Sequence, residues 1–162
     1  MKTSGTWLVA AIVILAAAVA GLTLVYHWNR TRAVIEYFGP ADAELILGAD
    51  QVFLIRHVDG QTERRDITHV ADLDDLQKAL VEDASYRIPG ELTKAKPQWT
   101  ITLEFHRGGQ SCAVDVDPQM GVIQAGGKQE QLDADPIREG MQEFFAYAIS
   151  RTAPIPPKSD SE

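Results

Sequence analysis

An uninterrupted apolar run near the N-terminus constrains this chain more than any other feature. Residues 7–26, WLVAAIVILAAAVAGLTLVY, carry no charge, and as an α-helix they would extend about 30 Å, the thickness of a bilayer's hydrocarbon core. Trp7 and Trp28 lie at its two ends, where amphipathic aromatic side chains suit the headgroup regions. We therefore predict a short polar tail over residues 1–6 and one transmembrane helix over residues 7–28, with the lipid bilayer as its partner.

A cleaved signal peptide is the alternative to a retained anchor. Lys2 supplies a minimal positively charged start, and Ala18-Val19-Ala20 fits a cleavage site of the small-x-small type. The apolar run continues past that site as far as Tyr26, which favours retention. Positive charges flank the run almost equally, so the signal-like character of the segment decides the orientation, and we expect the domain on the non-cytoplasmic side.

The remainder of the chain fits one domain. Residues 29–152 are enough for a single hydrophobic core and too few for two. Short helical patterns alternate with strand patterns joined by tight turns. This order is typical of an α+β domain, with an antiparallel sheet of about four to six strands packed against helices. Residues 153–162 contain three prolines and no apolar periodicity, so we expect a disordered tail.

Turn residues predict the first hairpin and capping residues predict the helices. Asp59-Gly60 would join strands over residues 51–58 and 61–68, with Glu63 opposite Arg56. Helices are expected over residues 40–47, from Asp72 to about Asp83, and from Asp135-Pro136 onward. The last helix would place one apolar stripe on the sheet, formed by Ile137, Met141, Phe144, Phe145, Ala148 and Ile149.

A second hairpin is predicted at Gly108-Gly109, where Arg107 would pair with Gln110. In this register the apolar residues of both strands meet on one face, whereas a shift by one residue would set an aspartate against them. The pairs expected on the apolar face are Phe105 with Cys112, Leu103 with Val114, and Ile101 with Val116. Cys112, the single cysteine, would therefore be a core residue rather than a nucleophile.

His106, Glu104, Asp115 and Asp117 share the opposite, polar face of this hairpin. Carboxylates and an imidazole together could bind a cation or exchange protons, so these four residues are the candidate metal or acid–base site. A solvated sheet face is the plainer interpretation, because strand alternation places polar residues there in any case. We therefore assign no catalytic, cofactor-binding or metal-binding residue, and we expect no cofactor.

The net charge and the absence of a catalytic motif reduce the number of functional classes that fit this chain. The chain has 15 basic and 23 acidic residues, a net charge of −8, which lacks the cationic surface that a nucleic-acid binder needs. The leading interpretation is a non-enzymatic, membrane-tethered interaction or accessory module, with an envelope protein as its partner. The alternatives are a membrane-bound hydrolase-like or metal-assisted enzyme that uses the His106, Asp115 and Asp117 face, and a carrier that holds a small ligand between sheet and helices.

Overall fold

The structure is a computed structural model of the 162-residue chain, and it describes residues 13, 15–16, 18–19, 21–22, 32–58, 60–87 and 96–156. No helix within these residues is long and apolar enough to cross a membrane. The polar tail over residues 1–6 and most of residues 7–28 lie outside the described residues, so the transmembrane helix stays a prediction.

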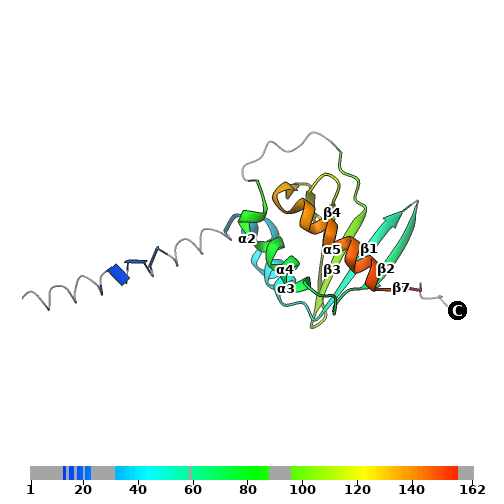
Figure 1. Ribbon diagram of the computed structural model, residues 1–162, viewed down its shortest axis with the longest axis horizontal. Coiled ribbons are helices and arrows are strands. Elements are labelled where there is room, and N and C mark those ends of the chain that lie inside the picture. Colours follow the sequence, from blue (N-terminus) through cyan, green and yellow to red (C-terminus); the bar gives the residue numbers. More distant parts are fainter. Residues whose placement is uncertain are drawn as a thin grey trace, which may run out of the picture.

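Seven antiparallel strands form one sheet (Figure 1). They are β1 (Gln51–Val58), β2 (Gln61–Asp66), β3 (Ile101–Arg107), β4 (Gln110–Asp117), β5 (Val122–Ala125), β6 (Leu132–Asp133) and β7 (Pro154–Ile155). Their order across the sheet is β6-β5-β4-β3-β1-β2-β7. The α+β class and the antiparallel sheet are confirmed. The strand count exceeds the predicted range by one, because Pro154–Ile155 pairs with Arg64 and Arg65 at a position where we expected a disordered tail.

Both hairpin registers agree with the sequence-based prediction. In β3–β4, Arg107 pairs with Gln110, Phe105 with Cys112, and Leu103 with Val114. In β1–β2, Glu63 lies opposite Arg56. Neither hairpin turn accounts for the place of β1 between β2 and β3. There β1 also pairs with β3, and Leu54 lies opposite Leu103. This long-range pair joins the two hairpins into one sheet.

Helices form the second layer of the domain. They are α2 (Arg32–Phe38), α3 (Pro40–Leu47), α4 (Leu73–Val81), the 3₁₀ turns η1 (Asp83–Ser85) and η2 (Asp135–Ile137), and α5 (Arg138–Arg151). Gly39, at a φ of 90°, separates α2 from α3, and Pro40 opens α3 where its missing N–H costs nothing. Asp72 precedes α4 as predicted, but it adopts a left-handed conformation, and its side chain accepts no capping hydrogen bond.

The core lies between one face of the sheet and these helices. Alternate residues of each central strand are buried, as expected for a sheet covered on one side. Fully buried side chains come from the strands (Val52, Leu54, Leu103, Phe105, Val114, Val116) and from the helices (Val34, Ile46, Leu80, Met141). On β3 the intervening residues Thr102, Glu104 and His106 remain partly exposed. The domain therefore has two layers, and the outer face of its central strands is polar.

Helix α2 is attached to the domain at both of its ends. The carboxylate of Asp83 accepts hydrogen bonds from the backbone N–H groups of Ala33 at 3.2 Å and Val34 at 2.8 Å. Near the other end, the Tyr37 hydroxyl donates to the carbonyl of Glu130 at 2.6 Å and accepts from the N–H of Ala125 at 3.0 Å. These contacts hold the first described helix of the domain against η1 and the β5–β6 segment.

Candidate functional site

The predicted site residues on the polar sheet face form two separate contacts. The Nε2 atom of His106 lies 3.4 Å from Oε2 of Glu104, and the same oxygen accepts a hydrogen bond from Arg64 at 2.8 Å. The Arg64 guanidinium also lies 4.0 Å from the ring centre of Phe53. Asp115 instead accepts a hydrogen bond from the Thr102 hydroxyl at 2.6 Å. Thr102 and Asp115 are directly opposed on β3 and β4, whereas Arg64 of β2 reaches Glu104 of β3 across β1.

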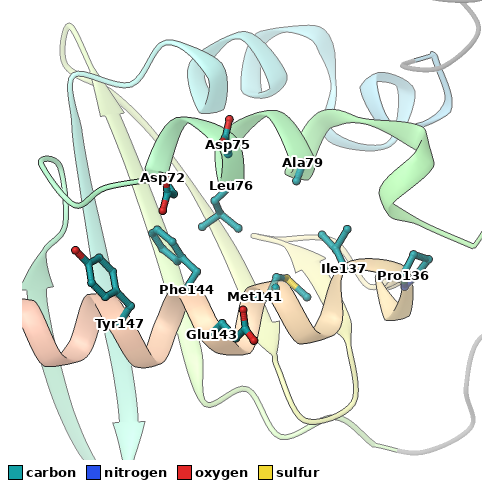
Figure 2. Close-up of a pocket in the computed structure, with 11 residues that line it drawn as sticks. Asp72, Asp75, Leu76, Ala79, Pro136, Ile137, Met141, Glu143, Phe144 and Tyr147 are labelled. Carbon is teal, nitrogen blue, oxygen red and sulfur yellow. The ribbon is translucent and has the colours of Figure 1, made fainter.

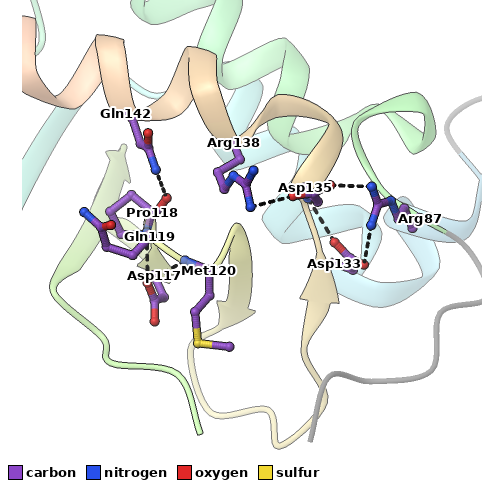
Figure 3. Close-up of polar contacts among 9 residues, drawn as sticks. All are labelled: Arg87, Asp117, Pro118, Gln119, Met120, Asp133, Asp135, Arg138 and Gln142. Carbon is purple, nitrogen blue, oxygen red and sulfur yellow. Dashed lines mark hydrogen bonds and ion pairs between the residues drawn. The ribbon is translucent and has the colours of Figure 1, made fainter. Parts of the chain in front are cut away.

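Asp117 departs from the position expected for it. Its side chain is buried, with 2% of its surface exposed, rather than solvated beside His106 and Asp115. One carboxylate oxygen accepts from the N–H groups of Gln119 and Met120 at 3.0 Å each (Figure 3). The other accepts from the N–H of Gln98 at 2.7 Å. The carboxylate therefore closes the turn between β4 and β5 and holds the chain that enters β3. A local turn, rather than strand alternation, determines its environment.

The placements of the potential metal ligands and of Cys112 bear on the enzyme interpretation. Within the described residues, no three histidine, cysteine, aspartate or glutamate side chains are grouped so that they could hold a metal ion. Cys112 is half-buried, and burial raises the pKa of its thiol to about 12, so the nucleophilic thiolate is scarce at neutral pH. The depression beside His106 is lined by Glu104, Ser111 and Cys112 among others, and His106 lies opposite Ser111 in the β3–β4 hairpin.

A groove lies between α4 and α5. It has a volume of about 530 Å³, within the range of about 300–1,000 Å³ that is usual for ligand sites. It is lined by Asp72, Asp75, Leu76 and Ala79 from the α4 side, and by Pro136, Ile137, Gly140, Met141, Glu143, Phe144 and Tyr147 from the α5 side. We call this feature the α4–α5 groove.

Apolar side chains form the walls of the α4–α5 groove. Leu76 and Phe144 point toward one another across it, and Ala79 faces the end that carries Ile137 (Figure 2). Met141 lies in the floor and is almost fully buried, whereas Phe144 is only partly buried. Gly140 adds open space, because a Cβ atom placed there would meet nothing within 4 Å. The two helices thus leave unfilled apolar surface between them.

The charged residues of the groove are all acidic. Asp72, Asp75 and Glu143 contribute carboxylates, and no lysine or arginine is among the lining residues. Asp75 lies 3.2 Å from the ammonium group of Lys78, which also pairs with Asp74 at 2.8 Å. The groove therefore combines apolar walls with negative charge at its edge, an arrangement that favours apolar ligands carrying positive charge.

The sequence analysis did not predict the groove, although two adjacent residues of the last helix give a local signal for it. Phe144 and Phe145 are neighbours on one helix, and neighbouring residues point about 100° apart, so both cannot face the sheet. Phe145 is buried in the core, and Phe144 turns toward α4. The predicted stripe of α5 is thus present, but its edge lines the groove instead of covering the sheet.

Fold and groove together define a two-layer α+β domain with a ligand-sized apolar groove between two helices. Comparisons of the chain with models of known protein families, with curated proteins and with solved structures find no match. The function must therefore be inferred from the groove and from the chemistry of the chain itself.

Proposed function

We propose that this chain is a single-pass membrane protein whose domain acts as a non-enzymatic interaction module, on the non-cytoplasmic side of the membrane. Residues 7–28 would hold the domain at the bilayer, and the α4–α5 groove would bind a segment of another envelope protein. The observation that carries the proposal is the groove, an open concavity of about 530 Å³ with apolar walls on the surface of the described domain.

Side chains in the N-terminal segment support the anchor. The described residues between 13 and 22 are helical, and the exposed fractions are 62% for Val13, 67% for Leu15 and 70% for Leu22. Transfer of such side chains from water into hydrocarbon lowers the free energy of the system. The run to which they belong has no polar face that would let it lie flat on a membrane surface, so spanning is favoured.

The roles of the polar residues support a module rather than an enzyme. Asp117 binds three backbone N–H groups, and Glu104 is paired with Arg64. These side chains already have structural partners, so they are poorly suited to exchange protons with a substrate. A carrier in the sense first considered would need a cavity between sheet and helices, where the core side chains pack.

Membrane extraction and crosslinking test the proposal. The full chain should stay with membranes through high salt and alkaline carbonate, and its intact mass should include the residues before Gly21. A photo-crosslinking amino acid at Ala79, inside the groove, should yield a discrete heavier adduct in native membranes. The same amino acid at Ser111, on the exposed end of β4, should not. Release by carbonate would refute the anchor, and equal crosslinking at both positions would refute the groove as the binding site.

A further inference from the structure

We propose that the α4–α5 groove binds an amphipathic helix of a partner protein, with apolar residues on one face and lysine or arginine beside them. This inference rests on the proposed function and specifies the class of partner. The same observations argue against two other occupants of the groove, a second copy of this chain and an anionic lipid. Shape, charge and available space each contribute to the argument.

The shape of the groove matches a helix. From the end of η2 along α5, the lining residues recur at helical spacing, from Ile137 through Gly140, Met141 and Phe144 to Tyr147. Ten residues of helix extend about 15 Å, so this wall is long enough for about three turns of a partner helix. Recognition of a helix in a groove uses anchor residues at positions i, i+3 or i+4, and i+7, which cover about 10 Å. Two or three apolar anchors therefore fit between the walls.

The charge at the groove selects the partner. Asp72, Asp75 and Glu143 would attract lysine and arginine side chains beside the apolar anchors. The same carboxylates would repel a fatty-acid carboxylate or an anionic lipid headgroup. A second copy of this chain is also disfavoured, because two grooves would bring their acidic edges together on chains that each have a net charge of −8.

Gly140 provides the space for close approach and a position for a test. It lies within α5, where glycine costs about 1 kcal/mol relative to alanine, and the space where its Cβ atom would lie has no neighbouring atom within 4 Å. A leucine side chain at this position would extend into the groove. Gly140→Leu should therefore block the partner helix and leave the fold intact, whereas Gly140→Ala should favour the helix and occupy little of the groove.

Peptide binding to the full chain in phosphatidylcholine nanodiscs tests the inference. The probe is a 14-residue peptide with leucines at helical i, i+3, i+4 and i+7 spacing and with lysine as its only charged residue type. One matched peptide replaces each lysine with glutamate, and another keeps the composition but scrambles the leucines. Empty nanodiscs measure binding to lipid alone. We expect the lysine peptide to bind at least about tenfold more tightly than either matched peptide, with affinity that falls as salt rises.

Protein variants complete the test. Gly140→Leu should weaken binding of the lysine peptide at least about tenfold, and Gly140→Ala should leave it within about twofold. Combined Asp72→Asn, Asp75→Asn and Glu143→Gln substitutions should weaken binding and remove most of its salt dependence. Glu139→Gln, on exposed α5 surface outside the groove, is the matched control and should change nothing. Thermal melts verify that each variant is folded.

The outcomes separate this inference from the proposed function. Equal affinity for the lysine and glutamate peptides, or undiminished binding to Gly140→Leu, overturns the basic helix as the occupant. If the Ala79 crosslink in membranes nevertheless persists and disappears in Gly140→Leu, the groove remains a protein-binding site for a partner of different chemistry. If that crosslink is also absent, the interaction module itself is refuted.

Discussion

Arg65 and Asp117 are two charged side chains that the fold buries, and both bind main-chain groups. Arg65 donates through Nη1 to the carbonyl of Ile149 at 3.0 Å and to the carbonyl of Thr152, at the C-terminal end of α5. A cation at that end also interacts favourably with the helix dipole. Asp117 instead accepts hydrogen bonds from three backbone N–H groups, two in the β4–β5 turn and one in the segment before β3. At the residue scale, buried charge in this domain stabilises the ends of elements.

Replacement of Asp117 by alanine should therefore be costly. Three backbone N–H groups would lose their acceptor in a buried place, and we expect the free energy of unfolding to fall by about 2–4 kcal/mol. Denaturant unfolding of the purified chain measures this change. Asp115→Ala is the control on the same strand, with an expected loss of about 1 kcal/mol or less, because Asp115 is only partly buried. Equal losses would contradict the structural role of Asp117.

Cys112 should react slowly with thiol reagents. Its pKa is raised to about 12 by burial, so the thiolate fraction at pH 8 is far below that of a free cysteine, whose pKa is about 8.5. We expect alkylation by iodoacetamide to be at least about 100-fold slower in the folded protein than in urea, measured by intact mass over time. Rapid alkylation without denaturant would contradict the assignment of Cys112 to the core.

At the scale of elements, contacts far apart in the sequence decide how helices are attached. Helix α2 receives its N-terminal cap from Asp83, about 50 residues further along the chain, rather than from its own flanking residues. Gln77 of α4 similarly donates to the carbonyl of Ile46 near the end of α3, at 2.7 Å. These two contacts join helix ends to neighbouring elements, which makes the formation of these helices interdependent.

Asp83→Ala should loosen α2 selectively. Loss of a capping carboxylate costs about 1 kcal/mol, and the backbone amides of Ala33 and Val34 would lose their acceptors. Hydrogen exchange should become faster at these two amides and remain nearly unchanged in β3 and β4. Glu36→Ala, on the exposed side of α2, should leave all of these rates unchanged. Uniform acceleration across the sheet would show that the cap acts on global stability instead.

Local chemistry explains which parts of the fold could be predicted from sequence. Gly108-Gly109 and strict alternation admit only one register, and β3–β4 adopts it. No turn joins β1 to β3, so their pairing depends on packing across the core and leaves no local signal. The short strand at Pro154–Ile155 likewise depends on an available edge of β2, which composition does not reveal.

The same distinction applies to the candidate site. Polar residues could be assigned to a sheet face by alternation, but the turn that buries Asp117 is a feature of the three-dimensional chain path. The α4–α5 groove depends on the spacing between two helices that are separated by more than 50 residues of sequence. Phe144, expected in the stripe on the sheet, lines that groove because Phe145 occupies the core position.

At the scale of the whole molecule, the two layers divide the sheet into a covered face and an open face. Leu103 and Thr102 are neighbours on β3 and lie on opposite faces. Leu103 is completely buried beneath the helices, whereas Thr102 is partly exposed and bonded to Asp115. The helices, and therefore the groove between two of them, lie on the covered side. The open side displays paired polar side chains.

A comparison of these two neighbours tests the layering. Leu103→Ala should lower the free energy of unfolding by about 2–5 kcal/mol, because it leaves a cavity in the core. Thr102→Ala should cost about 1 kcal/mol, because the hydrogen bonds of its hydroxyl to His57 and Asp115 lie on a partly exposed face. Denaturant midpoints of the two variants measure the difference. Equal costs would place a second packed layer on the open face.

The central position of β1 also has a consequence for synthesis of the protein. Leu54 pairs with Leu103, so the ribosome adds about 50 residues after β1 before its partner strand exists. At a synthesis rate of about 5–20 residues per second, one edge of β1 stays unpaired for roughly 2–10 seconds until β3 has been made. An unpaired strand edge is prone to associate with other chains. The β1–β2 hairpin covers the other edge of β1 as soon as β2 is made, so the edge that later pairs with β3 is the one left open during that interval.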